Sequence, residues 1–176
     1  MASKVVIPTD WTKTLSSSDH TDVSSYGNAL TNASSTTYGT LAGDGWILSY
    51  YLTFNPSDIP SRSNYVIDSV TCKIKAVSEY TESWLSFHFV SGGVTYDGGS
   101  VVAPSRYSAS QAEIFTLSFP SNASYSLLQN AESIYIETSL NSNEESQYLL
   151  VFGAELDIVY HDAVNYKIFN LILPSV

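Results

Sequence analysis

Hydrophobic and polar residues alternate with a period of two along most of the central part of this chain. The runs with this period are Trp46–Phe54, Val66–Ala76, Ser83–Val90, Ile114–Phe119, Ser133–Leu140 and Tyr148–Tyr160. Successive side chains of a β-strand point to opposite faces of the sheet, so the period predicts strands with one buried and one solvated face.

The phase of each run assigns individual side chains to the core or to the surface. Cys72 shares a face with Ile74 and is predicted to be a core thiol, not a nucleophile. His88 lies out of phase with the inward residues of its run and is predicted to be exposed or hydrogen-bonded on the outer face. From Tyr148 to Tyr160 the even-numbered residues are predicted to share a single face.

Turn-forming residues separate these runs. Two prolines follow the first run, Gly92-Gly93 predicts a tight turn into Val94–Tyr96, and Asp97-Gly98-Gly99 predicts the start of a loop. The only helix predicted is one turn around Leu127–Gln129. About eight strands separated by turns predict an all-β fold, an antiparallel β-sandwich of the jelly-roll type with extended N- and C-terminal segments. Immunoglobulin-like connectivity stays open, because both topologies produce the same alternation.

The two ends of the chain differ from the middle. Residues 1–40 are rich in Ser, Thr and Asn and are predicted to be an extended arm or surface segment beside a sandwich domain at 41–162. Residues 163–176 are apolar on both faces and are predicted to form either a last strand of the domain or an arm that pairs with a neighbouring subunit. The candidate interface residues of this segment are Tyr166, Ile168, Phe169, Leu171, Ile172 and Leu173.

The charge balance narrows the classes of partner. The chain has 176 residues, with 7 Lys and Arg against 17 Asp and Glu, which gives a net charge of −10. This charge disfavours nucleic acid and anionic membrane surfaces as ligands. No apolar stretch is as long as the ~20 residues of a membrane-spanning helix, and the N-terminus lacks the apolar core of a signal peptide.

No catalytic or cofactor motif is present in the sequence. The three histidines and the single cysteine have no metal-ligand spacing, and there is neither a Gly-x-Ser-x-Gly elbow nor a glycine-rich phosphate loop. The acidic pairs Glu79 with Glu82 and Glu155 with Asp157 are interpreted as solvated charge. We therefore expect no catalytic residue, no metal site and no cofactor.

Aromatic residues are frequent in the chain and are more informative about binding than the charged residues are. There are 13 tyrosines and three tryptophans, and Trp84 is out of phase with the inward residues Leu85 and Phe87. Rigid aromatic rings among hydroxyl side chains are typical of adhesive surfaces. Trp84, Tyr80 and Tyr107 are the candidate residues for stacking on a sugar ring.

The stretch from Gly45 to Tyr160 resembles the single-domain jelly-roll sandwiches of accessory virion proteins of tailed bacteriophages. The resemblance lies in Trp46–Phe54, in Ile59-Pro60, in Val66–Val70 and in Phe152–Tyr160. It implies a non-enzymatic capsid decoration, head-fibre or tail-associated subunit, made in the host cytoplasm and located in the virion. Its partners would be other virion proteins and further copies of itself. Such proteins are similar in fold to carbohydrate-binding modules, so the alternative function is recognition of a host glycan.

Overall fold

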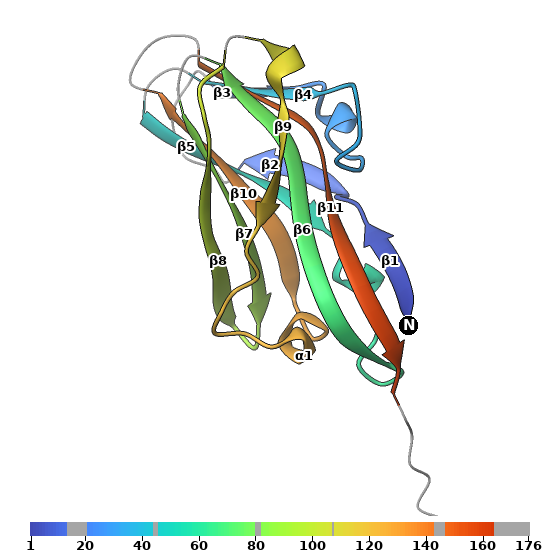
Figure 1. Ribbon diagram of the computed structural model, residues 1–176. Helices are drawn as coiled ribbons and strands as arrows, with labels where there is room; N and C mark the ends of the chain where they lie inside the picture. Colours follow the sequence, from blue (N-terminus) through green and yellow to red (C-terminus); the bar gives the residue numbers. More distant parts are fainter. Residues whose placement is uncertain (14–20, 44–45, 80–81, 107, 143–146, 164–176) are drawn as a thin grey trace, which may run out of the picture.

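The computed structural model describes residues 1–13, 21–43, 46–79, 82–106, 108–142 and 147–163. Within these residues eleven strands form two antiparallel sheets that pack face to face (Figure 1). The six-stranded sheet comprises β1 (Ala2–Val6), β3 (Thr21–Ser24), β4 (Gly39–Gly43), β6 (Tyr65–Glu79), β9 (Glu113–Leu117) and β11 (Gln147–Asp162). The five-stranded sheet comprises β2 (Asp10–Lys13), β5 (Trp46–Phe54), β7 (Ser83–Ser91), β8 (Val94–Ala103) and β10 (Ser133–Ser142). The predicted all-β antiparallel sandwich is confirmed.

The eight strands β4 to β11 have the connectivity of a jelly roll. The sheet orders are β3-β4-β11-β6-β9 and β2-β5-β10-β7-β8, and from β4 onward the chain crosses between the sheets at every step except the hairpin β7–β8. Two interlocked Greek keys of this kind form a jelly roll. In Figure 1 the layer of β8, β7, β10 and β5 lies on the left and the layer of β6, β11 and β1 on the right.

The N-terminal segment belongs to the sandwich and is not an arm beside it. β1 pairs with β11, β2 pairs with β5 and β3 pairs with β4. Trp11 of β2 is 3% exposed, and its indole Nε1 donates a hydrogen bond to Thr138 Oγ1 at 3.4 Å. The predicted boundary at residue 41 therefore does not separate two units of the described chain, because these strands satisfy sheet edges that only the folded sandwich presents.

The core lies between the inner faces of the two sheets, as the phase of the runs predicts. Cys72 is 2% exposed, and Leu85, Phe87 and Phe89 are fully buried. The predicted helical turn is present as α1 (Tyr125–Leu128), and Leu128 is buried against the core. The 3-10 helices are η1 (Tyr26–Asn28), η2 (Pro56–Asp58) and η3 (Ala109–Gln111).

The prediction of one continuous inward face along β11 is wrong at its N-terminal half. A β-bulge between Val151 and Gly153 shifts the pairing with β6 by one residue. Leu149 and Val151 face the main core before the bulge, whereas Ala154, Leu156 and Ile158 face it afterwards. Phe152 packs instead in a separate cluster on the outer face. An inserted residue reverses the phase of a two-residue period, which alternation alone does not reveal.

The predicted C-terminal interface residues, Tyr166 to Leu173, lie outside the described residues. In the part of the chain that the structure describes, no helix is both long and apolar enough to cross a membrane.

Candidate functional site

A hollow of about 310 Å³ lies on the outer face of the five-stranded sheet, over β5, β10, β7 and β8. The lining residues are Ser49, Trp84, Ser86, His88, Asp97, Ser100, Glu137 and Ser139. The lining thus combines one indole, one imidazole, two carboxylates and four hydroxyl groups. We call it the β7 hollow, because three of these residues come from that strand.

Strand register brings these residues together from distant parts of the sequence. Trp84 of β7 lies opposite Ser139 of β10, which lies opposite Ser49 of β5. In the next row Ser86 lies opposite Glu137. Residues opposite one another in an antiparallel pair project to the same face, so each row contributes several side chains to the hollow.

A β-bulge in β8 supplies the remaining side of the hollow. Asp97 pairs with His88 and Ser100 pairs with Ser86, so Gly98 and Gly99 stand opposite a single residue of β7. Residues three positions apart face opposite sides of a regular strand, whereas the extra residue lets both Asp97 and Ser100 line the hollow. Gly99 has a φ of +79°, and a Cβ on Gly98 would lie 1.8 Å from the Ser118 carbonyl oxygen. The sequence Asp97-Gly98-Gly99 is therefore not the start of a loop, as predicted, but a bulge within a strand that continues to Ala103.

His88 lies at the floor of the hollow and is only 7% exposed. Its Nε2 is 2.7 Å from Ser86 Oγ, a hydrogen bond, and its ring stacks on Tyr135 with centroids 5.1 Å apart. The prediction of a hydrogen-bonded histidine on the outer face is confirmed. The burial comes from its neighbours on β8 and β10, which alternation within β7 does not report.

The two carboxylates lie on either side of the imidazole. Asp97 Oδ1 is 3.7 Å from Nδ1 of His88, and Glu137 Oε2 is 3.6 Å from Nε2. Both separations exceed hydrogen-bond length, so neither carboxylate is hydrogen-bonded to the imidazole. Asp97 Oδ1 is held by the backbone N–H of Gly99 at 2.7 Å, which fixes the orientation of that carboxylate.

Two tyrosines support the floor of the hollow. Tyr135 packs edge-to-face with Tyr51, with ring centroids 5.2 Å apart. Burial raises the pKa of the Tyr135 phenol, and the nearby Tyr51, Glu137 and Asp97 raise it further. The phenol therefore stays protonated through the neutral and mildly alkaline range and remains a hydrogen-bond donor.

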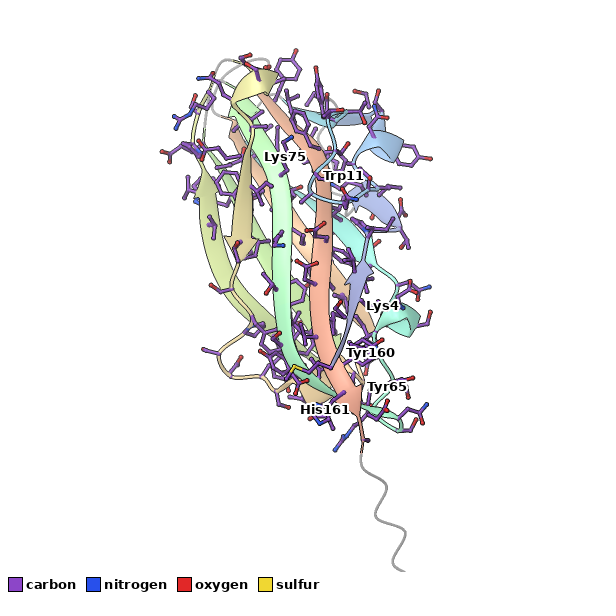
Figure 2. The ribbon with its side chains drawn as sticks, turned by 45° about the vertical axis from the view of Figure 1, so that its right-hand side comes forward. Lys4, Trp11, Tyr65, Lys75, Tyr160 and His161 are labelled. Carbon is purple, nitrogen blue, oxygen red and sulfur yellow. The ribbon has the colours of Figure 1, made fainter. Side chains whose placement is uncertain are left out.

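The lysines with described ion pairs belong to the six-stranded sheet. Lys73 of β6 pairs with Asp157 and Glu155 of β11, the latter at 3.4 Å. Lys4 pairs with Asp58 at 3.3 Å, and Arg106 lies 3.8 Å from Glu113 at the edge of the six-stranded sheet. Figure 2 shows Lys4 and Lys75 on the side formed by β1, β6 and β11. No lysine or arginine is among the residues that line the β7 hollow.

A second hollow of about 280 Å³ lies on the six-stranded sheet, and its lining is less suited to a polar ligand. It is lined mainly by Tyr38, Phe152 and small side chains around Lys75. Lys75 Nζ already donates to the Ser35 carbonyl oxygen at 2.9 Å and lies 4.8 Å from the centroid of the Phe152 ring. Its one charged group is thus engaged within the protein, and the β7 hollow is the better candidate site.

The structure places the predicted site residues in different ways. Trp84 lines the β7 hollow and is half-buried, whereas Tyr80 and Tyr107 lie outside the described residues. The acidic pair Glu155 and Asp157 forms ion pairs with Lys73, which raise the pKa of that ammonium, and is not free solvated charge. Among the described residues no group of three His, Cys, Asp or Glu side chains is placed so that it could hold a metal ion.

Sequence reasoning missed Glu137 as a member of a site and did not place Asp97 beside it. The phase of β10 carries a signal, because Tyr135, Glu137 and Ser139 alternate with the buried Ile134 and Ile136. That signal identifies an outer face and does not identify which strand lies beside it.

No protein-family model matches this chain, and no curated protein matches its sequence. Among solved structures the chain is similar to the CBM36-1 domain of a multidomain xylanase from the hindgut metagenome of Trinervitermes trinervoides, with 12% identity, a TM-score of 0.43 and coverage of 90% of this chain and 97% of that one. It is similar to the enzymatically active domain of bacteriophage CBA120 tailspike protein 4, with 12% identity, a TM-score of 0.45 and coverage of 92% of this chain and 19% of that one. A third similar structure is the family 11 carbohydrate-binding module of the Clostridium thermocellum cellulase Lic26A-Cel5E, with 13% identity, a TM-score of 0.40 and coverage of 89% and 87%.

Proposed function

We propose that this protein is a non-enzymatic glycan-binding β-sandwich and that its ligand lies in the β7 hollow. The observation that carries the proposal is the composition of the lining, in which the indole of Trp84 stands among hydroxyl and carboxylate groups on one sheet face. A sugar ring presents apolar C–H groups on its faces and hydroxyl groups around its rim. An aromatic face with polar groups beside it matches both parts.

Trp84 is the residue we assign to ring stacking. It is half-buried, so its position is fixed by the sheet while part of its surface remains available. Ser49 and Ser139 lie in the same cross-strand row and would exchange hydrogen bonds with the rim hydroxyls. Because these groups come from paired strands and not from loops, the site is formed before the ligand binds.

The arrangement of the carboxylates supports binding without hydrolysis. A glycosidase needs two carboxyl groups facing each other across the scissile bond. Here the His88 imidazole lies between Asp97 and Glu137 and is in contact with both. Incubation of a bound oligosaccharide with the protein should leave it intact by mass spectrometry, and release of shorter products would contradict this part of the proposal.

The test is binding to a glycan array, followed by isothermal titration calorimetry with the oligosaccharide that binds best. We expect Trp84→Ala to weaken that affinity about tenfold or more, a loss of ~1.4 kcal/mol, which is the scale of one aromatic contact. Tyr26→Ala is the matched control, because Tyr26 is an exposed aromatic at 53% in η1, away from the hollow.

Circular dichroism spectra of both variants should match that of the parent, which would show that the sandwich is intact. If no glycan on the array binds above a β-sandwich protein without glycan affinity, or if Trp84→Ala binds as tightly as the parent, the proposal is wrong.

A further inference from the structure

The β7 hollow carries negative charge that no described cation neutralises. Its two carboxylates, Asp97 and Glu137, both contact the single imidazole of His88. That imidazole carries one positive charge at most, so at least one negative charge remains in either of its protonation states. No lysine or arginine lines the hollow among the described residues.

Of the two carboxylates, Glu137 is the less exposed, so the lack of a neutralising partner costs it more than it costs Asp97. Its side chain is 28% exposed, whereas that of Asp97 is 62% exposed. No hydrogen bond to the Glu137 carboxylate is present within the described residues, and its contact to His88 Nε2 is 3.6 Å. A partly desolvated carboxylate without hydrogen-bond donors is costly, and a cationic donor on the ligand would remove that cost.

The imidazole itself offers a further unsatisfied group to a ligand. The side chain of His88 is 9% exposed, its Nε2 is engaged by Ser86 Oγ, and Nδ1 has only the 3.7 Å contact with Asp97. A ligand amine or hydroxyl beside Asp97 would lie next to this nitrogen, and a second one beside Glu137 would lie on the Nε2 side of the ring. The three groups lie on adjacent strands, Glu137 in the row next to Trp84 and His88 and Asp97 in the row after it.

We infer that the ligand of the β7 hollow is an amine-bearing glycan, a chain of hexosamine units with free amino groups, and that Asp97 and Glu137 hold ammonium groups of this chain while Trp84 stacks on a sugar ring. This inference rests on the proposed function. The same charges disfavour glycans that carry carboxylate or sulfate groups, because a like charge beside Glu137 would be repelled at short range.

The test compares three oligosaccharides of equal length by calorimetry at about pH 5.5, above the ordinary pKa of carboxyl groups and below that of amines. They are the glucosamine hexamer, its fully N-acetylated form and a galacturonate hexamer. We expect the glucosamine hexamer to bind about tenfold or more tightly than the acetylated form and the galacturonate hexamer not to bind. The preference should shrink when salt rises from about 0.1 M to about 1 M, since the Debye length falls from about 10 Å to about 3 Å.

The isosteric variants Glu137→Gln and Asp97→Asn should each remove most of the preference for the amine while neutral glycans still bind. Asp162→Asn is the matched control, because it removes one charge from an exposed residue at the end of β11, on the six-stranded sheet. If Asp162→Asn reduces the preference as much as Glu137→Gln does, the effect is the net charge of −10 and the inference is wrong.

Two further probes separate this ligand from other cations. Hexalysine carries the same number of amines without a sugar ring, and equal affinity for it would overturn the inference. Titration with calcium chloride alone should give no binding heat. A binding heat that is present in the parent and absent in Glu137→Gln would assign the carboxylates to a metal ion instead.

If neutral glycans bind through Trp84 without any preference for the amine, this inference fails and the proposed function stands. If none of the glycans binds, the proposed function fails with it.

Discussion

The indole of Trp84, the imidazole of His88 and the carboxylate of Glu137 have separate tasks in the proposed binding. The indole supplies apolar contact, the imidazole supplies a fixed polar floor, and the carboxylate supplies charge. The imidazole is held by a neighbour on another strand, because Tyr135 of β10 stacks against it. This support matters because a ligand then meets an imidazole whose orientation is already fixed.

Cys72 has a thiol that burial makes unreactive in the folded protein. It is buried in the core, and burial raises the pKa of its thiol well above the ordinary value. We expect an aromatic disulfide reagent at pH 8 to label the native protein at least a hundredfold more slowly than the protein unfolded in guanidinium chloride, because the thiolate is the reactive form.

The same shift fixes the sign of a pH effect on stability. The folded state keeps its proton above the unfolded thiol's pKa of about 8.5, so the contribution of Cys72 is constant below that pH and falls as the pH rises above it. Cys72→Ala should lack this alkaline decrease in the free energy of unfolding. In the labelling experiment, a native protein that reacts as fast as the unfolded chain would contradict the assignment of Cys72 to the core.

At the scale of elements, a bulge in β8 and a bulge in β11 determine which side chains reach the outer faces of the two sheets. The bulge in β8 turns Asp97 toward His88, and the bulge in β11 turns Phe152 away from the core. Both contain a glycine whose Cβ would collide with the backbone of another segment. Each bulge is therefore fixed by the packing of its glycine against another segment of the chain, and not by the propensity of the strand itself.

Gly153→Ala tests this account of β11. A Cβ at this position would lie 2.2 Å from the carbonyl oxygen of Asn32, and Ala154 N donates to the Thr31 carbonyl oxygen at 2.9 Å in the same contact. We expect a loss of about 2–3 kcal/mol in the free energy of unfolding by denaturant titration, the scale of overpacking in a rigid site.

Gly27→Ala is the matched control, because a Cβ there meets nothing within 4 Å. Its effect should stay within about 0.5 kcal/mol. Equal effects of the two substitutions would mean that the loop around Asn32 moves freely and does not hold the bulge.

At the scale of the whole molecule, the two sheets present faces of different character. The six-stranded sheet carries paired charges such as those of Lys73 with Glu155 and Asp157, and the five-stranded sheet carries the unneutralised carboxylates of the β7 hollow. The described lining of the β7 hollow comes from β5, β7, β8 and β10, whereas the predicted assembly uses residues of the segment 164–176. We therefore expect self-association and glycan binding to be separable.

The assembly prediction is tested by the solution mass of the full chain. We expect light scattering over a concentration series to give a discrete trimer or larger ring of the 19.2 kDa chain. Removal of residues 164–176 should leave a folded monomer, because the strands up to Asp162 already form both sheets. A full-length monomer at every concentration, or a truncated chain that unfolds, would contradict the interface assignment.

The sequence alone predicts the sandwich and most of its core, because a two-residue period is a local property that each strand displays by itself. The inward phase of Leu85, Phe87 and Phe89 needed no knowledge of the neighbouring strands. The placement of Trp84 on the outer face followed from the same phase.

Only the tertiary structure decided which strands lie side by side and where the period breaks. Trp84, Glu137 and Asp97 belong to three strands whose order is set by crossings between the sheets, and pairing partners leave no trace in alternation. The strands β1 to β4 were missed because their stability comes from pairing with distant strands and with one another, and not from their own short apolar pattern. Local periodicity thus determined the elements and their buried faces, while long-range hydrogen bonding determined the β7 hollow and its charge.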